Sequence, residues 1–570
     1  MKHIACLILF FQLSFLQAQN PLVIPPALTG TNFNLNIQEG TTQFVSGINT
    51  PTYGINGSLL APTLIVNKWD WVTMNVTNNL TGNGNSTTIH WHGLHVPAMA
   101  DGGPHQIILQ NTTWSPQFQI LNSAGTFWYH PHGVNKTDRH VSKGIAGMII
   151  IKDSAEAALN LPRTYGTDDF PVIVQTKAFD VLHQIAIATA LDTLPMVNGT
   201  VNPFLNAPAQ VVRLRLLNGA SDRTFMFGFS NNMSFHQIAT DGGLIDSAVT
   251  LNRLRLSNGE RAEILVDLTS LQNDSVYLMS YGSELPNGII GSPQVGMGMA
   301  NIVDYDSNPL NGADFNLLKI KVVAPTVNPV TTIPTSLVEN SPLQGTQATV
   351  FRTLTFAPDS GAMQLMASGP FTINSRFFDM DSINQTVYLN DVEIWTLDNQ
   401  TLVAHPFHIH DVQFNILDIN GSTPPAYLNG KKDVVLVMPQ QTVTFVTRFD
   451  DFADATTPYM YHCHLLHHED DGMMGSFLVV DTTATVISPL SFGEGLGVRI
   501  FPNPTTDFLN IVSADNEIFS LTVFNSIGEN LYSAVSTSNF QLQTRNLSNG
   551  LYFIHVKSQN NFFIQKFIKQ

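Results

Sequence analysis

The histidines of this chain gather in four short segments. A single His-x-His pair is a weak sign of a metal site, but these segments hold 11 of the 18 histidines. Imidazole is a ligand that suits copper and other transition metals, so the clustering predicts metal binding. The segments are His90-Trp91-His92, His130-Pro131-His132, His405-Pro406-Phe407-His408-Ile409-His410 and His462-Cys463-His464-Leu465-Leu466-His467-His468.

Cys463 stands between two of these histidines. On a β-strand, residues i and i+2 share a face, while residue i+1 points to the other side. If this segment is a strand, His462 and His464 face one side and Cys463 faces the opposite side. One strand can therefore contribute ligands to two copper sites.

The spacing around Cys463 predicts a blue-copper site on its side of the strand. A thiolate, two imidazoles and a weakly bound thioether make an electron-transfer site of this kind. His405 stands at odd spacing from His408 and can face Cys463, and His468 follows the cysteine by five residues. Met473, ten residues after Cys463, is the expected axial ligand.

Eight paired histidines remain once His405 and His468 are assigned to that site. Eight imidazoles would hold three copper ions at two or three nitrogens each. We therefore expect a second site with three copper ions. Its predicted ligands are His90, His92, His130, His132, His408, His410, His462 and His464.

Short strands must position these ligands, because helical periodicity is hard to find in the chain. Alternating segments such as 212–216 and 443–447 recur, with turn signals such as Asn198-Gly199 between them. Regularly spaced short strands with such turns are typical of β-sandwiches or Greek-key barrels. We expect an all-β chain with three blocks, followed by a smaller one. The three blocks are 21–155, 165–310 and 345–482.

The histidine segments and their neighbours resemble the multicopper oxidases, which are three-domain cupredoxin proteins. The resemblance spans about residues 30–482, and it is closest to the bacterial laccase, cuprous-oxidase and bilirubin-oxidase branch. It implies that each block is a cupredoxin-like Greek-key β-barrel. The matching stretches are His90-Trp91-His92-Gly93-Leu94, Gly125-Thr126-Phe127-Trp128-Tyr129-His130-Pro131-His132, the segment 405–410 and the segment 461–474, with weaker matches at 239–243, 259–263 and 371–374.

The resemblance also implies a copper type for every predicted ligand, with no position missing. His405, Cys463, His468 and Met473 match the type 1 ligands, and His90 and His408 match the type 2 ligands. The type 3 pair is matched by His92, His130, His132, His410, His462 and His464. Four copper ions per chain are implied.

An activity follows from the same resemblance. Electrons from a reducing substrate enter at the type 1 copper and pass through Cys463 to His462 and His464, and the three-copper cluster reduces dioxygen to water. Hydrogen-bonded carboxylates can relay the protons that water formation needs, and Asp101 and Glu469 match the family's acidic positions. The alternatives are a solvated turn acid for Asp101 and a purely structural partner for Glu469.

The reducing substrate is left open between alternatives. Phenols or aromatic amines, oxidised as in a laccase, are the first expectation, and cuprous ion is the second. Cuprous oxidases usually carry a Met-rich insertion near the type 1 site, whereas the 17 methionines here are scattered. A third reading is a non-enzymatic cupredoxin-fold protein that binds copper or acts structurally; the complete ligand set speaks against it. The methionines nearest to clusters are Met297, Met299, Met363 and Met366.

Residues 1–18 are predicted to be a signal peptide. Lys2 precedes a largely apolar run over 4–16, and Ala18 is a small residue at a cleavage point. The run is too short for an ordinary membrane-spanning helix, and no later apolar run is long enough, so no transmembrane segment is expected. Cleavage would leave Cys463 as the one thiol, which metal ligation would protect from oxidation.

The last stretch, 500–570, resembles the C-terminal sorting domain of the type IX secretion system. Pro502-Asn503-Pro504, Gly550-Leu551-Tyr552 and the Lys-x-x-Lys end at 566–569 carry the resemblance. It implies a small β-sandwich, recognition by the type IX machinery, and a protein that is secreted or attached to the outer surface. A polar, glycine-containing linker is expected over 483–499.

Composition excludes one class of partner. The formal net charge is -17 with 26 lysines and arginines, and nucleic acids need a positive surface, so no nucleic-acid partner is expected. Two cysteines cannot form a disulfide framework. A low charged fraction of 12% beside 43% hydrophobic residues argues against a disordered chain.

Overall fold

A computed structural model of the chain divides it into two units, Met1–Val479 and Val480–Gln570. The predicted signal peptide and residues 483–497 of the predicted linker lie outside the described residues. The described residues are 19–82, 85–187, 191–297, 308–359, 369–481, 498–501, 505–513, 519–525, 528–536, 540–557 and 562–569.

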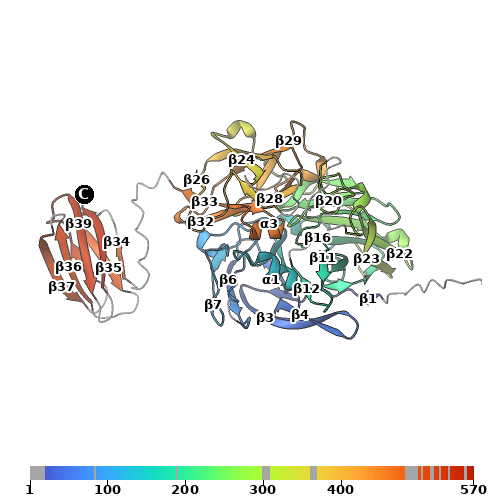
Figure 1. Ribbon diagram of the computed structural model, residues 1–570, viewed down its shortest axis with the longest axis horizontal. Coiled ribbons are helices and arrows are strands. Elements are labelled where there is room, and N and C mark those ends of the chain that lie inside the picture. The colour runs from blue at the N-terminus through green and yellow to red at the C-terminus, as the bar shows by residue number, and fades with distance from the viewer. Residues whose placement is uncertain are drawn as a thin grey trace, which may run out of the picture. The chain divides into compact units, whose positions relative to one another are not determined.

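Two sheets with the strand orders β4-β3-β6-β7 and β2-β5-β10-β9 make up the first block, with β8 added beside β6. Alternation decides which side chains enter the core: in β3, Phe33, Leu35 and Ile37 are buried and the residues between them are exposed or half-buried. The strands appear in blue shades in Figure 1. They are β2 (Ala27–Thr29), β3 (Asn32–Val45), β4 (Ile48–Ile55), β5 (Thr63–Asn67), β6 (Trp71–Asn78), β7 (Thr113–Trp114), β8 (Gln117–Gln119), β9 (Gly125–Tyr129) and β10 (Gly147–Lys152).

The second block also pairs two sheets, of six and eight strands. Its sheets include β1 and β23, which lie outside the predicted range 165–310. The prediction missed them because a strand can pair with one that is distant in the chain, and sequence periodicity does not show which strands pair. The strands are β1 (Asn20–Pro21), β11 (Asp169–Phe179), β12 (Ile185–Ala186), β13 (Leu194–Val197), β14 (Thr200–Val201), β15 (Pro203–Pro208), β16 (Val211–Asn218), β17 (Phe225–Phe229), β18 (Phe235–Thr240), β19 (Gly243–Leu251), β20 (Leu254–Leu256), β21 (Arg261–Asp267), β22 (Ser275–Tyr281) and β23 (Asp314–Val323).

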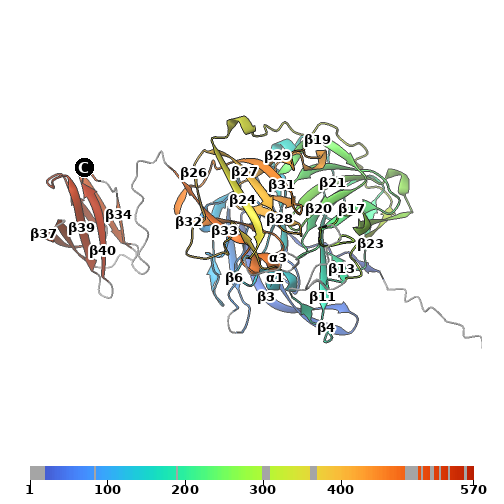
Figure 2. The same cartoon turned by 45° about the horizontal axis from the view of Figure 1, so that its top comes forward.

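The third block carries two of the four histidine segments. Its sheets have the orders β25-β24-β27-β31-β29 and β26-β33-β32-β28-β30, and Figure 2 shows β27, β28 and β31 close together. The strands are β24 (Val350–Pro358), β25 (Phe371–Ile373), β26 (Gln385–Tyr388), β27 (Val392–Asn399), β28 (His405–Ile409), β29 (Phe414–Ile419), β30 (Val434–Val437), β31 (Thr442–Arg448), β32 (Asp454–Cys463) and β33 (Met474–Val480).

Helices are few and short among the described residues. The α-helices are α1 (Thr137–Lys143), α2 (Ser154–Ala157) and α3 (Leu466–Asp470), and the 3-10 helices are η1 (Ala98–Ala100), η2 (Thr269–Leu271), η3 (Gly282–Glu284), η4 (Gly345–Gln347) and η5 (Ala426–Leu428). α1 and α3 lie side by side (Figures 1 and 2), and the Asp470 carboxylate accepts hydrogen bonds from the amides of Thr137 and Asp138 at 2.9 and 3.0 Å. In the described chain, every helix is too short or too polar to cross a membrane.

The second unit has its own core between a three-stranded and a four-stranded sheet. Leu509, Leu521 and Ile554 are buried in it. Its strands are β34 (Val498–Phe501), β35 (Phe508–Ser513), β36 (Phe519–Asn525), β37 (Asn530–Ser536), β38 (Phe540–Gln543), β39 (Gly550–Lys557) and β40 (Phe562–Lys569). The prediction of an all-β chain is confirmed in both units.

Candidate metal centre

The four histidine segments meet where the first and third blocks contact each other. His90 and His130 form a bridge within the first block, and β28 pairs with β32 in the third, where His408 lies opposite His462. Nε2 of His132 lies 3.1 Å from Nε2 of His462 across the two blocks. Residues about 330 positions apart thus share one buried centre.

Cys463 lies with two histidines on one side of β32. Its Sγ is 3.4 Å from Nδ1 of His405 and 3.6 Å from Nδ1 of His468, and all three side chains are buried. Met473 belongs to the same buried apolar cluster, and its carbonyl accepts a hydrogen bond from the Cys463 amide. The residues predicted for the blue-copper site are therefore brought together; we call them the thiolate group.

The eight remaining histidines lie on the other side of β32, and we call them the eight-histidine cluster. They form three buried groups in which the possible ligand atoms lie within 4.8 Å of one another. His462 and His464, which flank Cys463, enter different groups. The groups are His90 with His408 and His410, His92 with His130 and His464, and His132 with His410 and His462.

Several imidazole nitrogens in this cluster face one another. His92 Nδ1 lies 3.3 Å from His130 Nε2, and His410 Nε2 lies 3.4 Å from His462 Nε2. Metal–imidazole bonds of about 2.0–2.1 Å put two ligand nitrogens roughly 3.3 Å apart at a tetrahedral angle. The nitrogens are therefore spaced as two imidazoles on one metal ion would be.

The orientation of the imidazoles also fits metal ions. Nδ1 of His90 and Nδ1 of His408 are held by the carbonyl oxygens of Asp101 and Asp433 at 3.0 and 2.8 Å. Their Nε2 atoms, and both ring nitrogens of His464, are buried and find no hydrogen-bond partner among the described residues. Buried polar atoms are nearly always paired, and a bound cation would pair with such nitrogens.

Burial favours the neutral form of these imidazoles, which is the form that binds metal. The pKa falls because of burial first and neighbouring imidazoles second: well below 6.5 for His92, His130, His132 and His408, and to about 3 for His410 and His464. In the thiolate group, burial lowers the pKa of His405 to about 3 and raises the pKa of the Cys463 thiol. A thiolate at Cys463 therefore needs a cation beside it.

The two acids predicted to handle protons border the eight-histidine cluster. Oδ2 of Asp101 accepts a hydrogen bond from Nδ1 of His410 at 2.8 Å. Oε2 of Glu469 lies 3.2 Å from Nδ1 of His462, and Oε1 lies 3.4 Å from Nδ1 of His132. Burial by itself raises both carboxyl pKa values, but the adjacent imidazoles lower them below the ordinary range. Asp101 is 1% exposed, so the alternative of a solvated turn acid is wrong.

Sequence reasoning missed three polar residues that support the ligands. Asp433 lies 3.2 Å from Nε2 of His92 and forms an ion pair with Arg261. Thr401 Oγ1 lies 2.9 Å from Nε2 of His405. Arg261 stands in one of the stretches that match the family weakly, whereas Asp433 and Thr401 belong to no motif.

Four of the eight histidines outside the ligand groups lie in or near the histidine segments or in the first block. Each is held by other polar atoms, so none is drawn into the metal centre. His95 contacts Asp451 and Gln413, His105 contacts the Met380 carbonyl, His140 contacts Thr87, and His467 contacts Asp222.

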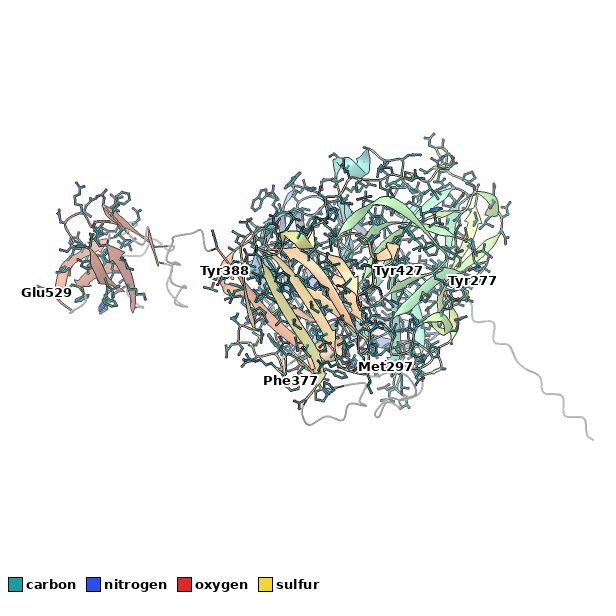
Figure 3. The ribbon with its side chains drawn as sticks, turned by 90° about the horizontal axis from the view of Figure 1, so that it is seen from above. Tyr277, Met297, Phe377, Tyr388, Tyr427 and Glu529 are labelled. Carbon is teal, nitrogen blue, oxygen red and sulfur yellow. The ribbon has the colours of Figure 1, made fainter. Side chains whose placement is uncertain are left out.

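Two exposed apolar residues contact segments that adjoin the thiolate group. The Met297 amide donates to the carbonyl of Leu402 at 2.9 Å, next to Thr401, and Phe377 packs against Gly472. Met297 is 44% exposed and Phe377 is 40% exposed, and Figure 3 shows both at one edge of the first unit. Met299, Met363 and Met366 lie outside the described residues.

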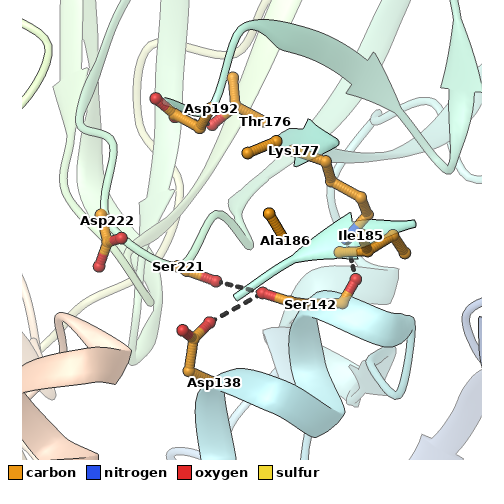
Figure 4. A pocket seen from close by; sticks show the side chains of 10 residues that line it. Asp138, Ser142, Thr176, Lys177, Ile185, Ala186, Asp192, Ser221 and Asp222 are labelled. Atoms are coloured by element: carbon orange, nitrogen blue, oxygen red, sulfur yellow. Dashed lines mark hydrogen bonds between the residues drawn. The ribbon is translucent and has the colours of Figure 1, made fainter. Parts of the chain in front are cut away.

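A small polar pocket lies beside α1, which supplies Asp138 and Ser142 to its lining (Figure 4). Ser142 donates from Oγ to Oδ1 of Asp138 at 2.8 Å, and Lys177 donates from Nζ to the Ser142 carbonyl at 2.6 Å. Asp222 lines the pocket and pairs with His467 at 2.5 Å. None of the predicted copper ligands lines this pocket as the described residues define it.

Comparison with family models identifies three regions. Residues 36–156 and 347–483 match models of the multicopper oxidases, and residues 499–570 match the secretion system C-terminal sorting domain. The two oxidase matches contain all four histidine segments.

Relatives match most of this chain. Multicopper oxidase mco of Staphylococcus epidermidis is 32% identical over 483 residues, covering 82% of this chain and 94% of its own. Cell division protein FtsP of Shigella dysenteriae is 30% identical over 469 residues, covering 81% and 93%. The structure of a bacterial laccase-like multi-copper oxidase, CueO, from the lignin-degrading bacterium Ochrobactrum sp. has a TM-score of 0.70 at 33% identity, covering 81% of this chain and 100% of that one.

These matches confirm the predicted cupredoxin-like architecture and the sorting domain. The relatives and the solved structure align over 81–82% of this chain, and the fold brings the histidine segments into one buried centre. The chain belongs to the multicopper oxidase family of copper-dependent oxidoreductases that use dioxygen, and it carries a secretion-system sorting domain.

Proposed function

We propose that this chain is a laccase-like oxidase, which oxidises phenols or aromatic amines one electron at a time and passes four electrons to dioxygen to form water. One observation carries the proposal: Cys463, the last residue of β32, lies in the thiolate group, while the residues before and after it, His462 and His464, lie in the eight-histidine cluster. The thiolate group would accept single electrons, and the adjacent eight-histidine cluster could hold several metal ions that collect them.

Four copper ions per chain are proposed, one in the thiolate group and three in the eight-histidine cluster. His405, Cys463, His468 and Met473 are the proposed type 1 ligands. His90 and His408, whose Nε2 atoms are unpartnered among the described residues, are the proposed type 2 ligands. The proposed type 3 ligands are His92, His130, His132, His410, His462 and His464.

Copper, when bound, supplies the redox chemistry: one-electron oxidation of the donor and reduction of dioxygen. The chain provides the path between the two sites, since Cys463 is covalently bonded to both His462 and His464. It also excludes water, because all proposed ligands are buried.

Protons are proposed to arrive through two carboxylates. Oδ2 of Asp101 holds the proton of His410 Nδ1 at 2.8 Å, and Glu469 places one oxygen near each of two further imidazoles, His132 and His462. A carboxylate in such a position can take a proton and pass it to reduced oxygen.

An aromatic donor suits the surface beside the thiolate group. Phe377 and Met297 are exposed there, and aromatic and thioether side chains favour contact with aromatic rings. Cuprous ion is the second candidate, because thioether sulfur is also a soft ligand for Cu(I). The variants Phe377→Ala and Met297→Ala are designed to separate the two candidate substrates. In Phe377→Ala we expect the KM for a phenol to rise and the KM for cuprous ion to stay unchanged.

The primary test is oxygen uptake by the copper-loaded protein with a phenol and with cuprous ion in parallel. About four copper ions per chain, a blue colour and faster uptake with the phenol support the proposal. Faster uptake with cuprous ion would favour the second candidate. The absence of uptake with either donor would contradict an oxidase.

A non-enzymatic role is the remaining alternative, because one relative at 30% identity is a cell division protein. The complete set of cysteine and histidine side chains argues for copper loading and turnover instead. Copper analysis decides the point: a chain that purifies from copper-supplemented medium without copper would support the structural alternative.

The chain is proposed to be exported. A signal peptide at 1–18 would direct it across the inner membrane. The sorting domain predicted at 500–570 would direct type IX secretion to the medium or the cell surface; it follows the linker predicted at 483–499, of which residues 498 and 499 lie in β34. The three blocks 21–155, 165–310 and 345–482 would form the exported cupredoxin domains, the second extended by β1 and β23. Detection of the chain only in the cytoplasm of its host would contradict this proposal.

A further inference from the structure

A buried ion pair links the second block to the third directly behind the eight-histidine cluster. Arg261, the first residue of β21, donates from Nη1 to Oδ1 of Asp433 at 2.5 Å and from Nη2 to Oδ2 at 2.6 Å. Both residues are 0% exposed. A bidentate pair of this kind fixes the plane of the carboxylate as well as its position.

Asp433 in turn contacts two proposed ligands. Its Oδ1 lies 3.2 Å from Nε2 of His92, and its backbone carbonyl lies 2.8 Å from Nδ1 of His408. A carboxylate paired with arginine accepts hydrogen bonds only, so Nε2 of His92 must carry the proton. Nδ1 of His92 then keeps its lone pair and faces His130, where a metal ion would bind.

Gly93 gives an independent sign that the ion pair is built into this place. Its φ is 84°, a conformation that glycine adopts readily. A Cβ atom at Gly93 would collide with the carboxylate of Asp433 and the guanidinium of Arg261. The backbone directly after His92 therefore passes over the ion pair with no space for a side chain.

The charges around this pair do not balance. Arg261 and Lys432 are surrounded by the carboxylates of Asp433, Asp241 and Glu260, so three negative groups face two positive groups, and all five are buried. An excess charge away from water is costly unless a counter-charge lies nearby. Copper cations in the adjacent cluster would provide that positive charge.

We propose that Arg261 is a positioning residue for the three-copper site. Arg261 orients Asp433, and Asp433 fixes the proton of His92 on Nε2 and holds the ring of His408. One proposed type 3 ligand and one proposed type 2 ligand therefore depend on Arg261. The second block, which supplies none of the predicted ligands, thereby controls copper loading. This inference rests on the proposed function, because it assumes three copper ions in the eight-histidine cluster.

The test compares copper retention in Arg261→Gln, Arg261→Lys and Asp433→Asn with the full-length wild-type chain. Copper per chain and its transfer to a chelator are measured, together with the visible absorbance of the thiolate group. Loss of a residue that supports a metal ligand lowers metal affinity about 10–100-fold. We expect a loss in that range in Arg261→Gln, confined to the eight-histidine cluster, with the visible absorbance preserved. Arg261→Lys keeps the charge without the bidentate geometry, and Asp433→Asn keeps an acceptor for His92, so both should fall between.

Arg352→Gln is the matched control. Arg352 forms a bidentate pair with Glu393, at 2.6 and 2.9 Å, within the third block and without contact to the proposed ligands. Wild-type copper retention in Arg261→Gln, or equal losses in Arg352→Gln, would overturn the inference. If Arg261→Gln does not fold, Arg261→Lys decides by the same measurement. A wild-type chain that binds no copper would refute the proposed function instead, so the two failures are distinguishable.

Discussion

Sγ of Cys463 lies 3.4 Å from Nδ1 of His405, although 58 residues separate them in the chain. The register of β28 against β32 creates this proximity. Phe407 pairs with Cys463, and His405 precedes Phe407 by two residues, so it lies on the same face of β28. The neighbours of Cys463 point to the opposite side of the strand and join the eight-histidine cluster. Cys463 of the thiolate group is thus joined by one peptide bond each to His462 and His464, which belong to the eight-histidine cluster.

Cys463→Ser is expected to uncouple the donor from dioxygen. A serine oxygen is a poor replacement for the thiolate that defines a blue-copper site, while His462 and His464 stay in place. Copper content should fall by about one ion per chain, the visible absorbance should vanish, and donor oxidation should drop by more than the roughly 100-fold typical of removing a supporting residue. Metal analysis, absorbance and oxygen uptake measure these effects. Retained blue colour would exclude Cys463 as the ligand.

Met473→Leu is expected to raise the potential of the proposed type 1 copper. The axial ligand tunes the redox potential of such sites, and leucine has no sulfur lone pair to stabilise the oxidised ion. Redox titration of the visible band measures the change. Met148→Leu is the control, because Met148 is buried in the first block and touches no proposed ligand. An unchanged or lower potential in Met473→Leu would show that Met473 is not the axial ligand.

Glu469→Gln is expected to keep the visible absorbance and the copper content but to slow oxygen reduction. Glutamine preserves the volume and an acceptor oxygen, yet it cannot carry a proton between His132 and His462. A positioned acid or base contributes typically about 10²–10⁴-fold to a rate, so a loss in that range is expected. Stopped-flow reoxidation of the reduced protein isolates this step.

Asp101→Asn extends the same test to the second carboxylate. Asp101 contacts a different imidazole, that of His410, so the double variant should be slower than either single variant if the two acids provide separate routes. Turnover at the wild-type rate in Glu469→Gln with full copper would restrict Glu469 to a structural role.

Much of the metal centre could be predicted because the ligands lie in short local motifs. The period of two along a strand was sufficient to place Cys463 opposite His462 and His464. The odd spacing from His408 likewise predicted that His405 faces the cysteine. These are relationships within a few residues, where strand geometry leaves little freedom.

The supporting contacts could not be predicted, because they join distant segments. Arg261 and Asp433 are 172 residues apart, and nothing local to either marks the other. Alternation in 212–216 predicted a strand correctly, but it does not show whether the arginines of the strand are exposed. Arg213 and Arg215 are buried, because they pair with Glu263 and Asp169. Sheet membership of β1 and β23 depends on the same kind of long-range pairing.

The contribution of Lys177 to the stability of the first unit is expected to become more favourable as pH rises from about 8 to 10.5. Burial lowers the pKa of this lysine from 10.5 to about 8, so in that window the unfolded chain binds a proton that the folded chain has released. The Lys177 contribution to stability therefore increases as pH rises through the window. The pKa difference corresponds to about 3 kcal/mol in the free energy of unfolding. Below pH 8 the buried Lys177 is protonated, and the free energy of unfolding is lowered by this full amount.

Lys177→Met removes this titration, because the methionine side chain is neutral at every pH. The stability of the wild type relative to Lys177→Met should improve by the same amount from pH 8 to pH 10.5. Thermal unfolding at a series of pH values measures the difference. Lys152→Met, at an exposed position, is the control and should shift little. Parallel pH profiles for the wild type and Lys177→Met would mean that Lys177 has access to water through the pocket in Figure 4.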